Sequence, residues 1–315
     1  MNELHPIISG AYEVAVSKGR NPDSILVDAM TAFSPILPKL EWTKSNRQTS
    51  HSFREVRKID GVGRFDWDGI MPRIRADFSM GSENLTAIGG VIEVGRDFAQ
   101  QTGGVDAYLK ESAVLFAREL GMQLENAFYY RIHEVAVAKH RRWSCNATGT
   151  SAGTLAVLTP TPSECCALFS PVYPRSDEPR FFELEKLSGG ATYLDQQGRA
   201  VYGAMLKSAV GLLLANERLF ATLDGIDPSS ANFDKKFPEM VSELLDEILI
   251  NDKTIFVMNH KLKNRIANQF AAMTKANKLI SFDDRFGMSI AGIKVVPSQN
   301  VPLSVALPTA ETDAA

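Results

Sequence analysis

The sequence contains few of the residues from which disulfide frameworks and acid–base sites are built. It has three cysteines, Cys145, Cys165 and Cys166, in 315 residues. They cannot all pair with one another and none lies in a C-x-x-C motif, so a disulfide scaffold is excluded and a reducing compartment fits best. We interpret the adjacent Cys165 and Cys166 as small, semi-buried thiols. The five histidines leave few groups that could exchange protons near neutral pH.

The motifs of common enzyme classes are missing as well. The sequence has no G-x-x-x-x-G-K-[ST] phosphate loop, and Gly61-Val62-Gly63 lacks the third glycine of a dinucleotide fingerprint. His133-Glu134 begins like an H-E-x-x-H zinc motif, but Val137 occupies the position of the second histidine. We interpret His133-Glu134 as a polar face near a helix end. We therefore expect no enzyme, no catalytic residue, no cofactor and no metal site.

The sequence also lacks a strong charge and a long apolar run. Its net charge is -3, whereas proteins that coat nucleic acid are usually strongly basic. The most apolar stretch, residues 204–215, contains Lys207 and is too short to span a bilayer. The first residues do not resemble a signal peptide. We expect a soluble protein that has no membrane partner and stays in the cell that makes it.

The residues that are present predict an α+β chain that begins with a mixed N-terminal arm over residues 1–52. Asn21-Pro22-Asp23 is typical of a helix start and predicts a short helix through about Phe33. Basic residues outnumber acidic ones between Lys39 and Arg64. This block is either a solvated arm or a segment that contacts a partner.

Residues 53–98 predict a long extended excursion, because β-favouring side chains partly alternate with charged ones. Its tip, residues 71–83, mixes apolar and charged side chains, as interfaces do. Two such strands would be marginal alone, and long free edges are a liability, so we expect another copy of the chain to cover them. Our candidate inter-subunit contacts are Arg54, Arg57, Arg73, Ile74, Arg75, Phe78, Met80 and Glu83.

Residues 105–138 give the strongest helix signal. Apolar residues recur at helical spacing from Leu109 to Ile132 without a proline. At about 1.5 Å per residue this helix would reach about 50 Å, enough to cross a domain. We expect Leu120 and Leu124 to be buried against a sheet. Residues 139–182 are rich in Ser, Thr and Pro and predict a loop-rich insertion that includes one strand at 155–158.

The remaining chain alternates between strands and helices. Strands are predicted at 181–187, 200–214 and 219–223. A compact α/β unit follows, with helices at 233–249 and 260–274 and strands at 254–258 and 290–296. We therefore divide the chain into an arm (1–52), an excursion (53–98), a central domain (99–230), an α/β domain (231–305) and a disordered tail (306–315).

The order of these elements and several short motifs resemble the tailed-phage major capsid proteins of the Hong Kong 97-like fold, in particular the podophage-like branch. The motifs that carry the resemblance are Thr49-Ser50-His51-Ser52-Phe53, Arg73-Ile74-Arg75-Ala76, Gly90-Val91-Ile92-Glu93-Val94, Val210-Gly211-Leu212-Leu213-Leu214-Ala215-Asn216-Glu217, Phe220-Ala221-Thr222-Leu223-Asp224-Gly225-Ile226, Phe256-Val257-Met258-Asn259-His260-Lys261-Leu262 and Ala291-Gly292-Ile293-Lys294-Val295-Val296. Lys294 stands where the family more often has proline. The insertion at 139–182 also departs from the family pattern.

The resemblance implies an N-terminal arm, an E-loop (53–98), a P-domain (99–230) with a spine helix (105–138), and an A-domain (231–305). It implies that copies form hexamers and pentamers of an icosahedral shell, which encloses double-stranded DNA without sequence-specific binding. A scaffolding protein and a portal are implied partners, and the location is the virion, with synthesis in the host cytoplasm. Two alternatives stay open: an encapsulin-like compartment shell with the same fold, and a soluble enzyme of unknown type.

Overall fold

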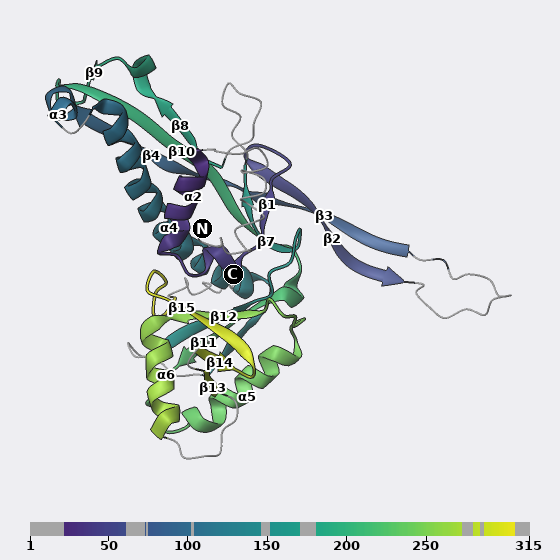
Figure 1. The fold of residues 1–315 in the computed structure, drawn as a ribbon. Helices are drawn as coiled ribbons and strands as arrows, with labels where there is room; N and C mark the ends of the chain where they lie inside the picture. The colour runs from purple at the N-terminus through teal and green to yellow at the C-terminus, as the bar shows by residue number, and fades with distance from the viewer. Residues whose placement is uncertain are drawn as a thin grey trace, which may run out of the picture.

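The protein is an α+β chain in which two sheets and one projecting hairpin are arranged around a long helix (Figure 1). The computed structural model describes residues 22–60, 73, 75–101, 104–145, 152–170, 181–272, 280–283 and 287–305. The predicted fold class is confirmed. Among these residues, no helix is both long and apolar enough to cross a membrane.

The long helix α4 (Val105–Ala138) begins and ends where the sequence predicted. Its apolar stripe, which includes Ala117, Leu120 and Leu124, is buried against a six-stranded sheet. The interpretation of His133-Glu134 as a polar face is wrong for His133, which is fully buried, whereas Glu134 is exposed. His133 is buried because a second sheet packs beside the end of the helix.

The six-stranded sheet is built around the longest strand, β10 (Ala200–Leu214). All residues of strand β4 (Thr86–Gly95) pair with β10 in antiparallel register. The short helix α3 (Arg96–Gln101) follows β4 in the chain. The predicted excursion over 53–98 is therefore too long, since β4 belongs to this sheet. The other members, all on the opposite side of β10, are β1 (Trp42–Lys44), β7 (Cys165–Phe169), β8 (Glu183–Lys186) and β9 (Tyr193–Leu194), with the short helix η2 (Leu187–Gly190) between the last two.

The N-terminal arm packs into the central domain from α2 to β1, whereas Lys44, Arg47 and Arg54 of the basic block that follows are exposed. Helix α2 (Pro22–Ala32) lies along α4, and η1 (Leu37–Lys39) leads into β1, which pairs in parallel with β7. Met30, Leu37 and Leu40 are almost completely buried. Since these apolar side chains lie in the main core, the arm belongs to the central domain from α2 to β1. The contact of the basic block with a partner stays a prediction, and residues 1–21 lie outside the described residues.

The second sheet has seven strands and forms the lower half of the molecule in Figure 1, with α5 (Phe233–Asp246) and α6 (His260–Ala272) packed against it. Its order is β13 (Ile280–Asp283), β14 (Gly287–Ile290), β15 (Ile293–Ser298), β12 (Ile255–Asn259), β6 (Gly153–Leu158), β11 (Phe220–Ile226) and β5 (Arg142–Ser144). The short helix η3 (Glu217–Leu219) precedes β11.

Three predictions for this region differ from the structure. Residues 139–182 are not a separate insertion, because the described strands β5, β6 and β7 belong to the two main sheets and β6 lies inside the second one. The predicted strand at 155–158 is confirmed as part of β6. The α/β domain does not begin at residue 231, because β5, β6 and β11 belong to it. The final predicted strand is two strands, separated by a turn at Ala291 and Gly292, where φ is +50° and +80°.

One buried carboxylate ties three distant parts of the chain together. Glu125 on α4 accepts hydrogen bonds from the backbone N–H of Ile36 (2.7 Å), from Ser298 Oγ (2.9 Å) and from Asn300 Nδ2. Burial raises the pKa of Glu125, and the three hydrogen bonds oppose that rise. The N-terminal segment and the end of β15 are therefore both fixed to the middle of the long helix.

Candidate self-assembly interface

The outer part of the predicted excursion forms a two-stranded hairpin that projects away from both domains (Figure 1). Strand β2 (Ser50–Asp60) pairs with β3 (Arg75–Asn84) in antiparallel register, with one irregularity between Val56 and Lys58. In the part of the chain that the structure describes, neither strand belongs to a larger sheet. A two-stranded ribbon is marginally stable in water, so the hairpin depends on contacts at its root or with other molecules.

One face of the hairpin is bound to its own subunit. Because partners across an antiparallel pair share a face, Glu55 and Glu83 lie on the same side as Phe53. Glu55 Oε1 is 3.1 Å from Lys139 Nζ, just after the end of α4. Glu83 Oε2 is 3.1 Å from Arg131 Nη2, about two helical turns earlier. These two ion pairs connect both strands of the hairpin to the end of the long helix.

The opposite face of the hairpin exposes large apolar side chains. Met80 is 71% exposed and Phe78 is 50% exposed. Arg54 stands directly across from Met80 and is also exposed. An apolar centre next to a charged side chain is typical of the surfaces that proteins bury against one another.

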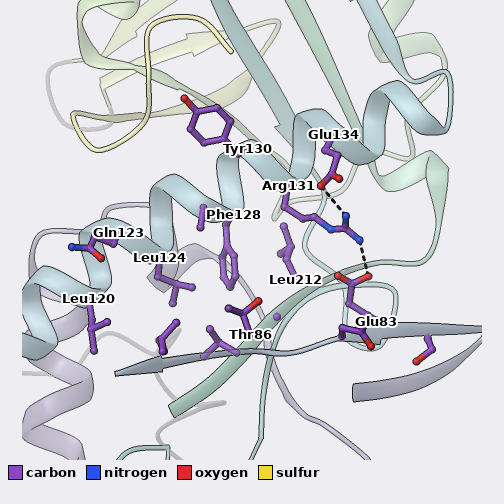
Figure 2. A pocket seen from close by; sticks show the side chains of 16 residues that line it. Glu83, Thr86, Leu120, Gln123, Leu124, Phe128, Tyr130, Arg131, Glu134 and Leu212 are labelled. Atoms are coloured by element: carbon purple, nitrogen blue, oxygen red, sulfur yellow. Dashed lines mark hydrogen bonds and ion pairs between the residues drawn. The ribbon is translucent and has the colours of Figure 1, made fainter. Parts of the chain in front are cut away.

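The root of the hairpin also borders a groove of about 690 Å³ (Figure 2). Leu124 and Phe128 on α4 form one wall, and Leu212 on β10 lies opposite them. Arg131 also lines the groove and links its two acidic neighbours. Besides the contact with Glu83, its Nη1 is 2.8 Å from Oε2 of Glu134. Burial raises the pKa of Glu83, while the hydrogen bond and charge of Arg131 lower it. The groove is thus lined by apolar side chains of α4 and β10 together with the ion pairs of Arg131.

A second exposed surface lies on the six-stranded sheet, on the face turned away from α4. Even-numbered residues of β10, such as Leu206, face the core, so Met205 and Ala209 face outward by alternation. Their partners across the strand pair are Val91, which is 52% exposed, and Ala87. The centre of this face is therefore apolar, and we call it the outer sheet face.

Charged side chains border the outer sheet face, and two of them at one end are exposed carboxylates without an ion pair among the described residues. Glu93 and Glu185 are exposed at this rim, and the hydroxyl of Tyr193 donates a hydrogen bond of 2.7 Å to Glu93 Oε1. Lys207 points the same way, but its Nζ is 2.7 Å from a carboxylate oxygen of Glu183. The acidic rim thus complements the positive charge that Arg54 carries beside Met80 on the hairpin.

The structure places the predicted contact residues in different environments. Arg54, Arg73, Arg75, Phe78 and Met80 are exposed on the hairpin or beside it, and their role as contacts between copies stays a prediction. Glu83 differs from them, because Arg131 engages its carboxylate at the hairpin root. Within the subunit, Glu83 is therefore an anchor of the hairpin.

Two further candidates and the predicted tip need separate comment. The side chain of Arg57 and the whole of Ile74 lie outside the described residues. Residues 75–83 are not the tip of the excursion, since they form most of the returning strand β3.

Sequence reasoning missed the residues that hold the hairpin. Arg131 and Lys139 are eight positions apart at the end of α4, a spacing of just over two turns that brings them toward similar sides of the helix. Their partners, Glu83 and Glu55, belong to different strands of the excursion. The sequence thus contains one basic residue near the end of α4, a second just after it, and two acidic residues on the excursion, but only the fold shows which residues form pairs.

The three thiols are all buried. Burial raises the pKa of Cys145 to about 11 and also raises the pKa values of Cys165 and Cys166. They are therefore protonated at neutral pH, the form in which a thiol is a poor nucleophile. Among the described residues, no group of three or more potential metal ligands is present.

No family model matches the chain, and no curated protein sequence matches it significantly. Several solved structures do match it. A chain in the structure of bacteriophage Epsilon15 is 12% identical, with 85% of this chain and 86% of that chain covered and a TM-score of 0.50. The bacteriophage JBD30 capsid is 8% identical, with coverages of 83% and 88% and a TM-score of 0.51. At such identities the similarity is one of fold.

Proposed function

We propose that this chain, which has the Hong Kong 97-like capsid fold, is the major capsid protein of a tailed phage and has no catalytic role. Its copies would form the hexamers and pentamers of an icosahedral shell around double-stranded DNA. The observation that carries the proposal is the projecting hairpin, whose outward face leaves Phe78 and Met80 in water. A scaffolding protein and a portal would be its partners, and the virion its location after synthesis in the host cytoplasm.

The exposed hairpin face can supply the energy of assembly. Fully burying a side chain such as Phe or Met gains roughly 1.5–3 kcal/mol relative to leaving it exposed. In a closed symmetric assembly every copy makes the same contact, so the gain is repeated around the shell. The hairpin adds only Phe53 of β2 to a small buried cluster at its root, and its strands pair only with each other in the described part of the chain.

The outer sheet face of a neighbouring copy is the complementary surface. It offers the apolar pair Val91 and Met205 beside an acidic rim, whereas the hairpin offers Phe78 and Met80 beside Arg54. Opposite charges at the rim would fix the register of the contact. The net charge of -3 also suits a shell that encloses DNA without gripping its phosphates.

The test is the double variant Phe78→Ser/Met80→Ser, compared with Phe78→Leu/Met80→Leu. We expect both to melt within a few degrees of the wild type by circular dichroism, because neither position is in the core. Only the serine variant should fail to form fast-sedimenting shells, because it alone loses the apolar contact. Val91→Asp on the outer sheet face should have the same effect as the serine variant.

Three outcomes would contradict the proposal. Normal shells from the serine variant would remove the hairpin face from assembly. A wild-type chain that stays a monomer at every salt and protein concentration, with and without scaffold, would argue against a shell protein. Particles purified from the natural source that contain cargo protein and no nucleic acid would indicate a compartment shell.

A further inference from the structure

Three ionisable side chains meet inside the junction between α4 and the seven-stranded sheet. His133 on α4 is fully buried, and its Nδ1 lies 3.5 Å from Oδ1 of Asp224 on β11. The other oxygen of Asp224 is paired with Nε of Arg142 on β5. Neither ring nitrogen of His133 has a hydrogen-bond partner among the described residues. The imidazole is thus held by packing next to an existing ion pair.

The other groups around His133 come from each element packed there. Tyr129, one turn earlier on α4, has its ring centroid 4.7 Å from that of His133, and its hydroxyl donates to the carbonyl oxygen of Thr154 on β6 at 2.9 Å. The backbone N–H of Cys145, after β5, donates to the carbonyl oxygen of Asp224. Lys236 of α5 acts electrostatically on the Cys145 thiol.

The surroundings favour an uncharged imidazole. Burial, together with the positive charge of Arg142, lowers the pKa of His133 to about 3. Burial raises the pKa of Asp224, and Arg142 opposes that rise. Protonating His133 in place would therefore put a second positive charge beside a carboxylate that Arg142 already neutralises. That cost disappears when the junction opens to water.

We propose that the junction between α4 and β11 is proton-sensitive, closed around an uncharged His133 and opened when His133 is protonated. The device lies within a single chain and does not depend on the proposed function. It joins the helix that supports the hairpin to the sheet of the second domain, so its opening would change how the two domains are held.

The sign of the pH effect follows from proton linkage. The closed state binds fewer protons than the open state, in which a histidine has a pKa of about 6.5. Closure is therefore fully favoured above about pH 6.5 and weakens as the pH falls below it. Between pH 8 and pH 5.5 the opening equilibrium should increase about tenfold. Asp224, with a raised pKa, acts in the opposite direction, so His133 must be isolated by comparison with a variant.

The experiment is hydrogen exchange of the full chain, followed by mass spectrometry and corrected for the intrinsic pH dependence of exchange. Protection of peptides covering 129–136 and 220–226 should fall about tenfold from pH 8 to pH 5.5 in the wild type. In His133→Gln it should change less than about twofold. His140→Asn is the matched control, because His140 is exposed at φ +55°, which asparagine tolerates. It should behave as the wild type.

A second variant, His133→Met, replaces the imidazole by an apolar side chain and covers the case in which His133→Gln does not fold. Wild-type protection that does not change with pH would overturn the proposal. So would a His133 variant that keeps the wild-type pH dependence. Equal loss of protection throughout both domains would also overturn it, because it would show global unfolding instead of an opening at this junction.

Discussion

The carbonyl oxygen of Met30 lies against the backbone of Gly121, so close that a β carbon at position 121 would overlap it. This contact brings the backbone of α2 onto the middle of α4. Glycine permits such a close approach between two helices because it has no side chain. The N-terminal segment therefore has a fixed position on the long helix. A second contact lies one turn further along α4, where the backbone N–H of Ile36 donates a hydrogen bond to Glu125.

Gly121→Ala should destabilise the subunit although alanine is the better helix former. The added methyl group must displace α2, and overpacking of this kind costs about 1–3 kcal/mol. Urea unfolding should show the loss. Gly95→Ala is the control, because a β carbon there meets nothing within 4 Å. An unchanged midpoint in Gly121→Ala would show that α2 does not stay on α4.

Leu120→Ala should lower the free energy of unfolding by roughly 2–5 kcal/mol, since the side chain is 8% exposed in the main core. Leu120→Asp should prevent folding. Leu115→Ala, on the same helix but 56% exposed, should change stability by less than about 0.5 kcal/mol. A soluble Leu120→Asp protein with normal melting would show that the buried face of α4 is wrongly assigned.

Arg131→Gln should loosen the hairpin without weakening the core. Its ion pair with Glu83 is partly exposed, so its loss should cost no more than about 1 kcal/mol in global unfolding. Hydrogen exchange at residues 79–84 should nevertheless become faster. Glu134→Gln removes only the partner on the same helix and should leave the hairpin unchanged. Equal exchange in both variants would rule out Arg131 as the anchor.

The shells should be noncovalent. Some members of the fold that this sequence resembles join subunits by lysine–asparagine isopeptide bonds, but Lys58 is the one lysine within residues 53–98. Arginine cannot replace it, because the guanidinium stays protonated. Boiling in detergent under reducing conditions should give one band near the chain mass of 34.6 kDa. A ladder of oligomers would contradict this.

The elements that the sequence predicted well are those with a local signal. Helix α4 has apolar residues at regular spacing over its whole length and no proline, so both of its ends were predicted correctly. The amphipathic helix α5 was found from the spacing of its apolar residues, although it contains Pro238, and strand β12 was found as a short apolar run. The mixture of apolar and charged side chains around Phe78 and Met80 indicated an exposed surface, and both residues are exposed. The Hong Kong 97-like fold, inferred from the order of these elements, is confirmed.

Tertiary structure decided what depends on pairing between distant residues. Strand β6 is a short, completely buried run, and its central place comes from β11 and β12, which follow it by more than sixty positions. Glu83 became an anchor only because Arg131 lies beside it in space. His133 had the sequence context of a polar surface residue, and a second sheet covers it. Local periodicity gives the elements, but burial and ion pairing are set by which elements meet, and that information is spread along the whole chain.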